Sequence, residues 1–314
     1  MSLLDDLARW KQSGAIRETQ YDVIAALVRK DRFPVYTELT ALLYLGVIST
    51  VAGIGWTIRE HFTSLGDVAI LCALTGAFVV SIAYCFVRGG PYTPAQQESP
   101  EFVFDYVVYF GCLIFGVELG FIEYRYQLLK DSWDHYLLLS SVMYFSLAYR
   151  FDNRLVLSLA LSTLAGWFGL RLYHLQWLHG MTREYALAYA AVVAMAGVAL
   201  HRARVKAHFL ETYLHVATNV ALGALTAGVF DRTASWSYVP GLLLGAALSI
   251  GLGVKFRRFA FVVYGVIYTY VGVSDRVVER LGFQEESIFA CYAVSAAIVV
   301  VFLVILARRF GRDA

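Results

Sequence analysis

Charge is scarce in this sequence, and its scarcity excludes an ordinary soluble domain. Asp, Glu, Lys and Arg make up 16% of the 314 residues, whereas soluble domains carry about 25%. The shortfall is concentrated in stretches with no charge at all, such as 39–58, 68–87 and 288–307, each 20 residues long. A helix of about 20 apolar residues crosses the ~30 Å of hydrocarbon in a bilayer.

Cysteine is scarce as well, and no familiar catalytic motif is present. The four cysteines, Cys72, Cys85, Cys112 and Cys291, lie inside apolar stretches without paired spacing, which argues against a disulfide framework and a zinc site. The sequence contains no GxSxG, HExxH, Walker or GxGxxG pattern and no basic tract suited to nucleic acid. We therefore predict no catalytic residues, no metal and no cofactor, and we expect a protein that is not an enzyme.

Ten apolar segments account for most of the chain and predict an all-α, polytopic transmembrane bundle over residues 35–314. The fourth and fifth are short and flank a polar turn at 150–154, so the sequence leaves open whether they cross the bilayer fully. The segments are 37–58, 67–87, 103–123, 136–149, 155–170, 184–200, 211–230, 237–254, 258–274 and 287–307.

Residues 1–34 are polar and of mixed charge, unlike a cleavable signal peptide. Two stretches, 2–12 and 17–30, have apolar residues at helical spacing, and Gly14 separates them. We predict a short cytosolic hairpin of amphipathic helices, followed by a first membrane helix that acts as an uncleaved signal.

The distribution of basic residues predicts the orientation of the spans. About two thirds of the 26 lysines and arginines fall in the amino-terminal segment, the even-numbered loops and the carboxy tail, and such residues are enriched in the cytoplasm. Both termini are therefore predicted to be cytoplasmic.

Polar residues inside the predicted spans are the candidates for a substrate or proton path. Glu211, His215 and Asn219 recur at steps of four on one helix face, and Glu118 lies deep in the third span. Such residues face the bundle or water because lipid does not solvate them. A Glu–His pair one turn apart can relay a proton. The alternative is an interhelical hydrogen-bond ladder with no transport role.

A second face carries only small residues. Gly241, Gly245, Ser249 and Gly253 also recur at steps of four, a pattern that lets helix backbones pack closely in lipid. We expect a helix-packing face, static in the simplest interpretation and a sliding interface in the other.

Four histidines fall in predicted outer loops, at positions 61, 135, 174 and 179. Their spacing matches no metal motif, so no metal or haem is expected, although the sequence alone does not decide whether these histidines bind one. Acid–base chemistry on lipids by His174 and His179 is the weakest of the functional alternatives.

The amino-terminal sequence resembles a known family. Trp10, Gly14, Ile16, Gln20 and Ile24 stand at positions similar to those that open bacterial predicted membrane proteins of the domain of unknown function 2157 family. The resemblance implies a bacterial inner-membrane protein with a cytosolic helical hairpin, and it brings no activity and no catalytic residues.

These observations favour an integral inner-membrane subunit or scaffold. Such a protein contacts lipids and either a membrane-protein partner or further copies of itself. The alternative is a secondary transporter of a small solute, proton-coupled through Glu118, Glu211 and His215.

Overall fold

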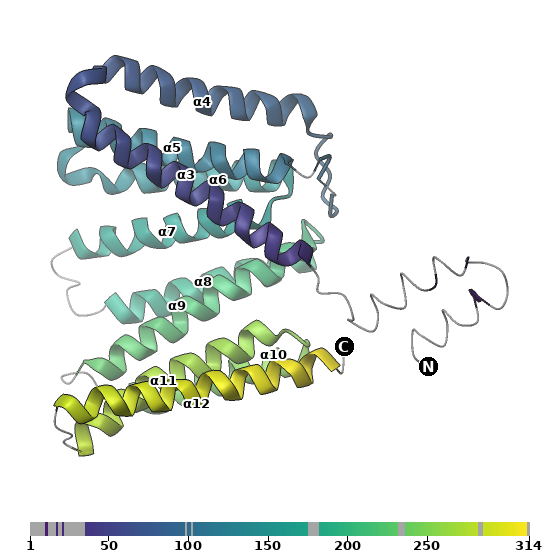
Figure 1. Ribbon diagram of the computed structural model, residues 1–314, viewed down its shortest axis with the longest axis vertical. Helices are drawn as coiled ribbons and strands as arrows, with labels where there is room; N and C mark the ends of the chain where they lie inside the picture. The colour runs from purple at the N-terminus through teal and green to yellow at the C-terminus, as the bar shows by residue number, and fades with distance from the viewer. Residues whose placement is uncertain are drawn as a thin grey trace. The chain divides into compact units, whose positions relative to one another are not determined.

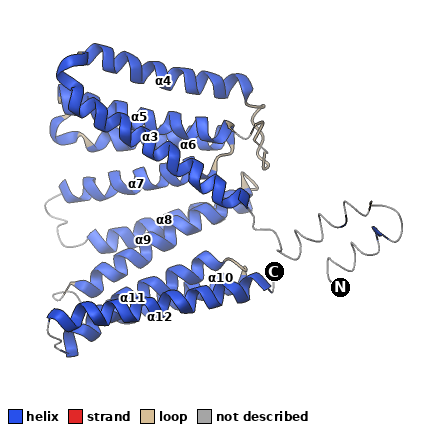
Figure 2. Ribbon diagram, in the orientation of Figure 1, coloured by secondary structure: helices blue, strands red, loops and turns tan. Residues whose placement is uncertain are grey.

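In the part of the chain that a computed structural model describes, all regular secondary structure is helical, with no strand there (Figure 2). The described residues are 10, 11, 17, 21, 35–97, 99–101, 103–174, 182–231, 236–281 and 285–312. The chain forms two compact units, 1–70 and 71–314, and each is considered by itself. The predicted hairpin over 1–34 falls almost wholly outside the described residues, so both it and the domain division remain predictions.

Each of the ten predicted apolar segments corresponds to one α-helix (Figure 1). The helices are α3 (Val35–Leu65), α4 (Asp67–Arg88), α5 (Phe104–Tyr126), α6 (Asp134–Phe151), α7 (Arg154–His174), α8 (Thr182–Arg202), α9 (Leu210–Phe230), α10 (Tyr238–Lys255), α11 (Phe259–Leu281) and α12 (Glu285–Arg312). The prediction of an all-α chain with many apolar helices is therefore confirmed.

Six of these helices are long and apolar enough to cross a membrane by their length and composition: α4, α5, α8, α9 with the 3₁₀ turn before it, α10 and α11. Shorter apolar stretches lie within α3, at Ala41–Thr57, and within α12, at Tyr292–Arg308. The number of crossings and the side on which the termini lie are not fixed by these lengths.

Helices α6 and α7 pack against each other. Helix α6 also contacts α5, and α7 contacts α5, α8 and α9. One buried cluster contains Leu147, Val156 and Leu161 together with residues of those neighbours. Ser141 donates a hydrogen bond to the carbonyl of Ala160 at 3.0 Å, so a polar side chain is satisfied inside this centre.

The second buried cluster lies among α9, α10 and α11. It is formed by Leu222 and Val229 of α9 with Leu242 and Ala246 of α10. Helix α12 packs on α11. Helices α9 and α10 carry most of the polar and small residues that the sequence suggested as candidates.

Candidate functional site

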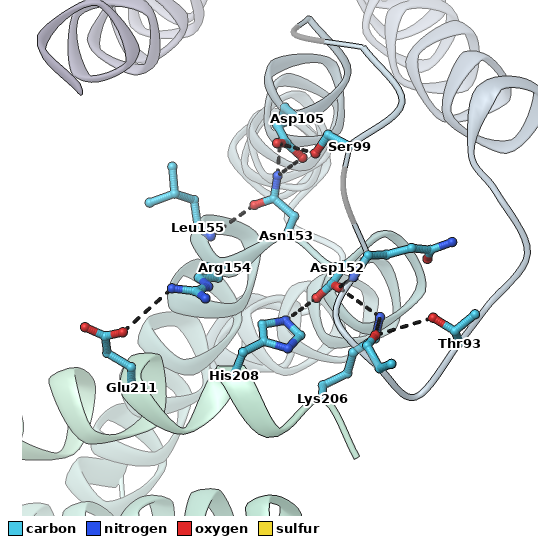
Figure 3. Close-up of polar contacts among 12 residues, drawn as sticks. Thr93, Ser99, Asp105, Asp152, Asn153, Arg154, Leu155, Lys206, His208 and Glu211 are labelled. Atoms are coloured by element: carbon cyan, nitrogen blue, oxygen red, sulfur yellow. Dashed lines mark hydrogen bonds and ion pairs between the residues drawn. The ribbon is translucent and has the colours of Figure 1, made fainter. Parts of the chain in front are cut away.

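Three connecting segments meet at one end of the 71–314 unit and bury a charged cluster there (Figure 3). The segments are the α4–α5 connection, the α6–α7 turn and the α8–α9 connection. They contribute the backbone of Gln97, the side chain of Asp152, and the side chains of Lys206 and His208. We call these four residues the Asp152 cluster.

The α6–α7 turn has the geometry that Asp and Asn tolerate best. Asp152 follows the last residue of α6 with φ 59° and ψ 35°, in the left-handed region, where short polar residues are several-fold enriched. The Asn153 side-chain oxygen then accepts hydrogen bonds from the backbone N–H groups of Leu155 and Val156 at 3.0 and 2.9 Å. This is the capping arrangement that begins a helix, so the residue pair ends α6 and starts α7.

The Asp152 carboxylate is buried, and both of its oxygens have partners. Its side chain is 2% exposed. One oxygen accepts the backbone N–H of Gln97 at 2.5 Å and faces the Lys206 ammonium at 3.1 Å. The other oxygen lies 2.5 Å from Nε2 of His208. A buried carboxylate requires this kind of compensation, because its desolvation is costly without partners.

Lys206 joins the α4–α5 connection to the rest of the cluster. Its side chain is fully buried, its ammonium donates to the carbonyl of Ala95 at 3.1 Å, and it lies 5.6 Å from the centre of the Tyr92 ring. Its backbone N–H donates to the carbonyl of Pro94 at 2.8 Å. The three ammonium protons thus have a carboxylate, a carbonyl and an aromatic face within reach.

A further polar chain extends from the same turn toward α5. The Asn153 side-chain N–H donates to the Asp105 carboxylate at 3.1 Å, and the hydroxyl of Ser99 donates to the other carboxylate oxygen at 2.6 Å. Asp105 lies in the first turn of α5. Its contacts connect the start of α5 to the α6–α7 turn.

The chemistry of the Asp152 cluster favours a structural role. Asp, His and Lys side chains can act as acids and bases. Here, however, they form ion pairs and hydrogen bonds with one another and with backbone atoms. The neighbouring cavity, lined by Gly89, Gly90, Gln97, Arg150 and Phe104 among others, has a volume of about 20 Å³, which is room for about one water molecule. The cluster therefore joins three loops and leaves little space for a substrate.

Sequence reasoning identified the polar turn at 150–154 but not the partners of Asp152. The left-handed preference of Asp-Asn was readable from the sequence. The pairing with Lys206 was not, since 54 positions separate the two residues and no periodicity links them. His208 was not among the candidate residues that the sequence suggested.

The polar face of α9, formed by Glu211, His215 and Asn219, lies against neighbouring helices; we call these three residues the polar ladder. Glu211 forms ion pairs with Arg258 before α11 at 3.1 Å and Arg154 of α7 at 3.7 Å, and lies 3.6 Å from His215. The His215 ring stacks on Phe261 of α11, with 4.5 Å between ring centroids.

Asn219 continues the same ladder one turn further into the bundle. Its side-chain N–H donates to the carbonyl of His215 at 2.8 Å, and its oxygen accepts the hydroxyl of Tyr268 at 3.3 Å. Tyr268 belongs to α11. The ladder is thus packed along the α9–α11 contact.

Glu118 has a different neighbourhood. It is half-buried on α5, and it accepts a hydrogen bond from the Thr75 hydroxyl of α4 at 2.5 Å. The structure brings Glu211, His215 and Asn219 together. The contacts of Glu118, by contrast, lead to α4, whereas those of the three α9 residues lead to α7 and α11.

The small-residue face of α10 lies against two helices of the same chain. A Cβ added at Gly245 would meet Leu222 and Leu225 of α9 at 3.2 Å. The Ser249 hydroxyl donates to the carbonyl of Phe261 in α11 at 2.7 Å. A Cβ at Gly253 would meet Val262 at 2.6 Å, and one at Gly241 would meet Leu225 at 3.2 Å. A groove free to receive another protein is therefore not present along this face.

Within the described residues, no three His, Cys, Asp or Glu side chains gather where they could hold a metal ion. His135 has Nδ1 2.9 Å from the carbonyl of Ser132. The side chains of His61 and His174, and all of His179, fall outside what the structure describes.

Comparison with known protein families gives a match over the amino-terminal part of the chain. No curated protein and no solved structure matches the chain. The family model described as predicted membrane protein, DUF2157, covers residues 8–157, which include α3 to α6 and the Asp152-Asn153 turn, and it ends within the first turn of α7. This part, just under half of the chain, therefore matches the DUF2157 family of predicted membrane proteins, which confirms the resemblance seen around Trp10, and the apolar helices support an integral membrane protein.

Proposed function

We propose that this chain is an integral subunit or scaffold of a complex in the bacterial inner membrane. Its domain 35–314 crosses the bilayer ten times, and its cytosolic hairpin 1–34 and carboxy terminus share the cytoplasmic side. The chain assembles with a membrane-protein partner or with copies of itself, among bilayer lipids.

Support for full crossing by α6 and α7 comes from the Asp152 cluster. Gln97 follows α4, Lys206 follows α8, and Asp152 joins α6 to α7, yet Gln97 and Lys206 both lie within hydrogen-bonding distance of the Asp152 carboxylate. Residue 152 is separated from residue 97 by α5 and α6. If α5 crosses, α6 must cross back for these residues to share a face. This favours ten crossings over eight.

The observation that carries the scaffold assignment is the use of the intramembrane polar groups in helix contacts. His215 is stacked on Phe261, Asn219 is bonded to Tyr268, and Ser249 is bonded to the backbone of α11. A transporter would use such groups to line a hydrated path at the bilayer midplane. Packed contacts between helices favour a structural role for them.

Glu118 is the observation that favours the alternative, a proton-coupled secondary transporter. Its carboxyl is half-buried and its α4 partner, Thr75, is neutral, and intramembrane carboxyls often mark ion pathways. Glu118→Gln separates the two functions. It should leave assembly unchanged in a scaffold and abolish substrate-dependent proton uptake in a transporter.

The test is the size of the particle extracted from native membranes. The tagged chain, extracted directly into polymer-bounded nanodiscs, should run as one complex larger than a single 35.1 kDa chain. The same complex should be recovered with Glu118→Gln. Recovery of a solitary monomer at native expression levels would contradict the scaffold function.

A further inference from the structure

A second cavity lies among α9, α10 and α11, at the end of these helices remote from the Asp152 cluster. Its volume is about 290 Å³, close to the lower limit of about 300 Å³ for pockets that bind small molecules. The cavity involves the last turn of α9, the first turns of α10 and the second half of α11. It is lined by Val229, Trp236, Val239, Leu242, Leu243, Gly272, Val273, Arg276 and Val277.

The walls of this cavity are aliphatic. Gly272 lies where α11 approaches α10, and a Cβ there would meet Leu242 at 2.4 Å. Leu243, Val273 and Val277 are between 38% and 46% exposed, so the cavity opens sideways from the bundle. An apolar cleft opening toward hydrocarbon accepts a flexible chain of methylene groups, which gains dispersion contacts with the aliphatic walls.

The end of the cavity carries two residues typical of the lipid headgroup level. Trp236 precedes α10 and is 72% exposed, and Arg276 of α11 is a lining residue. Tryptophan rings and long basic side chains are enriched at this depth. The Arg183–Asp231 ion pair, with 2.8 Å between Nη1 and Oδ2, joins α8 to the end of α9 beside the cavity. Among the described residues that line the cavity, Arg276 is the basic one.

We propose that this cavity binds one acyl chain of a bilayer phospholipid, with the lipid phosphate against the Arg276 guanidinium. Arginine presents five N–H donors in a planar fork that matches phosphate oxygens. The ligand is thus defined by an aliphatic chain joined to a phosphate. The proposal requires that the chain lies in a membrane and holds whether the protein is a scaffold or a transporter.

Photo-crosslinking in nanodiscs tests this site. The probe is phosphatidylethanolamine with a diazirine on one acyl chain, and the labelled peptides are located by mass spectrometry. Label should concentrate on residues 236–243 and 272–277. Val273→Phe, which fills the cavity, should reduce that label about tenfold, the effect of ~1.4 kcal/mol in binding. Val271→Phe is the matched control, since Val271 is also 38% exposed on α11 but does not line the cavity.

Competition with unlabelled lipids tests the phosphate contact separately. Phosphatidylethanolamine should displace the probe at about tenfold lower concentration than diacylglycerol, which lacks the phosphate, because hydrogen bonds to charged groups contribute about 1.5–3 kcal/mol. Arg276→Gln should remove that preference while the thermal unfolding midpoint reports whether the variant is folded. Label spread evenly over all exposed helices, or equal competition by the two lipids, would overturn the proposal.

Discussion

Replacing Asp152 with asparagine should lower the free energy of unfolding by about 3–5 kcal/mol, the usual cost of leaving one partner of a buried ion pair without the other. Asparagine tolerates the left-handed conformation of this turn and can still accept the N–H of Gln97. The substitution therefore tests the loss of the negative charge separately from the loss of turn geometry. The Lys206 ammonium remains fully buried without its counter-charge. Denaturant titration of the purified chain in mild detergent measures the change.

Two further variants show whether the pair itself is responsible. Asp152→Asn combined with Lys206→Met removes both charges and should recover at least about half of the loss, because apolar replacement of a buried pair is often neutral. Glu211→Gln is the control: its partners Arg154 and Arg258 are 47% and 57% exposed. Pairs as exposed as these contribute about 0–1 kcal/mol. An Asp152→Asn variant as stable as Glu211→Gln would refute the cluster's structural role.

Alanine at two glycines of α10 should change stability in opposite directions. A Cβ at Gly253 would lie 2.6 Å from Val262 Cγ2, 2.9 Å from the Val262 backbone nitrogen and 3.0 Å from the Arg258 carbonyl. Two of these atoms belong to the backbone and cannot rotate away. Gly253→Ala should therefore cost about 1–3 kcal/mol, as overpacking does in well-packed interiors.

Gly251 is the matched control on the same helix. It is exposed, and nothing lies within 4 Å of its added Cβ. Alanine is more favourable than glycine in a helix by up to about 1 kcal/mol, so Gly251→Ala should leave stability unchanged or raise it. Denaturant titration of both variants compares them directly. Equal effects at the two positions would show that the close contact between α10 and α11 is wrong.

The sequence predicted the positions of the ten helices well because charge is excluded from long apolar segments. The ends of the first and ninth were placed less well. Segments expected at 37–58 and 258–274 became Val35–Leu65 and Phe259–Leu281. The apolar pattern stops at charged residues such as Arg59 and Asp275, although the helices continue past them. Hydropathy marks the part of a helix that suits lipid, and the backbone can remain helical beyond that part.

The residue periodicity predicted faces but not their partners. Steps of four placed Glu211, His215 and Asn219 on one face, and that face packs on α11. No pattern in the sequence shows that Glu118 bonds to α4. The Asp152–Lys206 pair escaped prediction for the same reason, since contacts between distant segments depend on how the helices are packed.

The most direct test of the account is the side of the membrane on which four positions lie. Single cysteines at Gln96, Arg154, Ala203 and Leu128 are treated with a membrane-impermeant thiol reagent in intact and permeabilised cells. The native cysteines lie within apolar helices and give the background. Gln96, Arg154 and Ala203 should react only after permeabilisation, and Leu128 should react in intact cells. Arg154 reacting on the same side as Leu128 would show that α6 does not cross, and would contradict the ten-span fold.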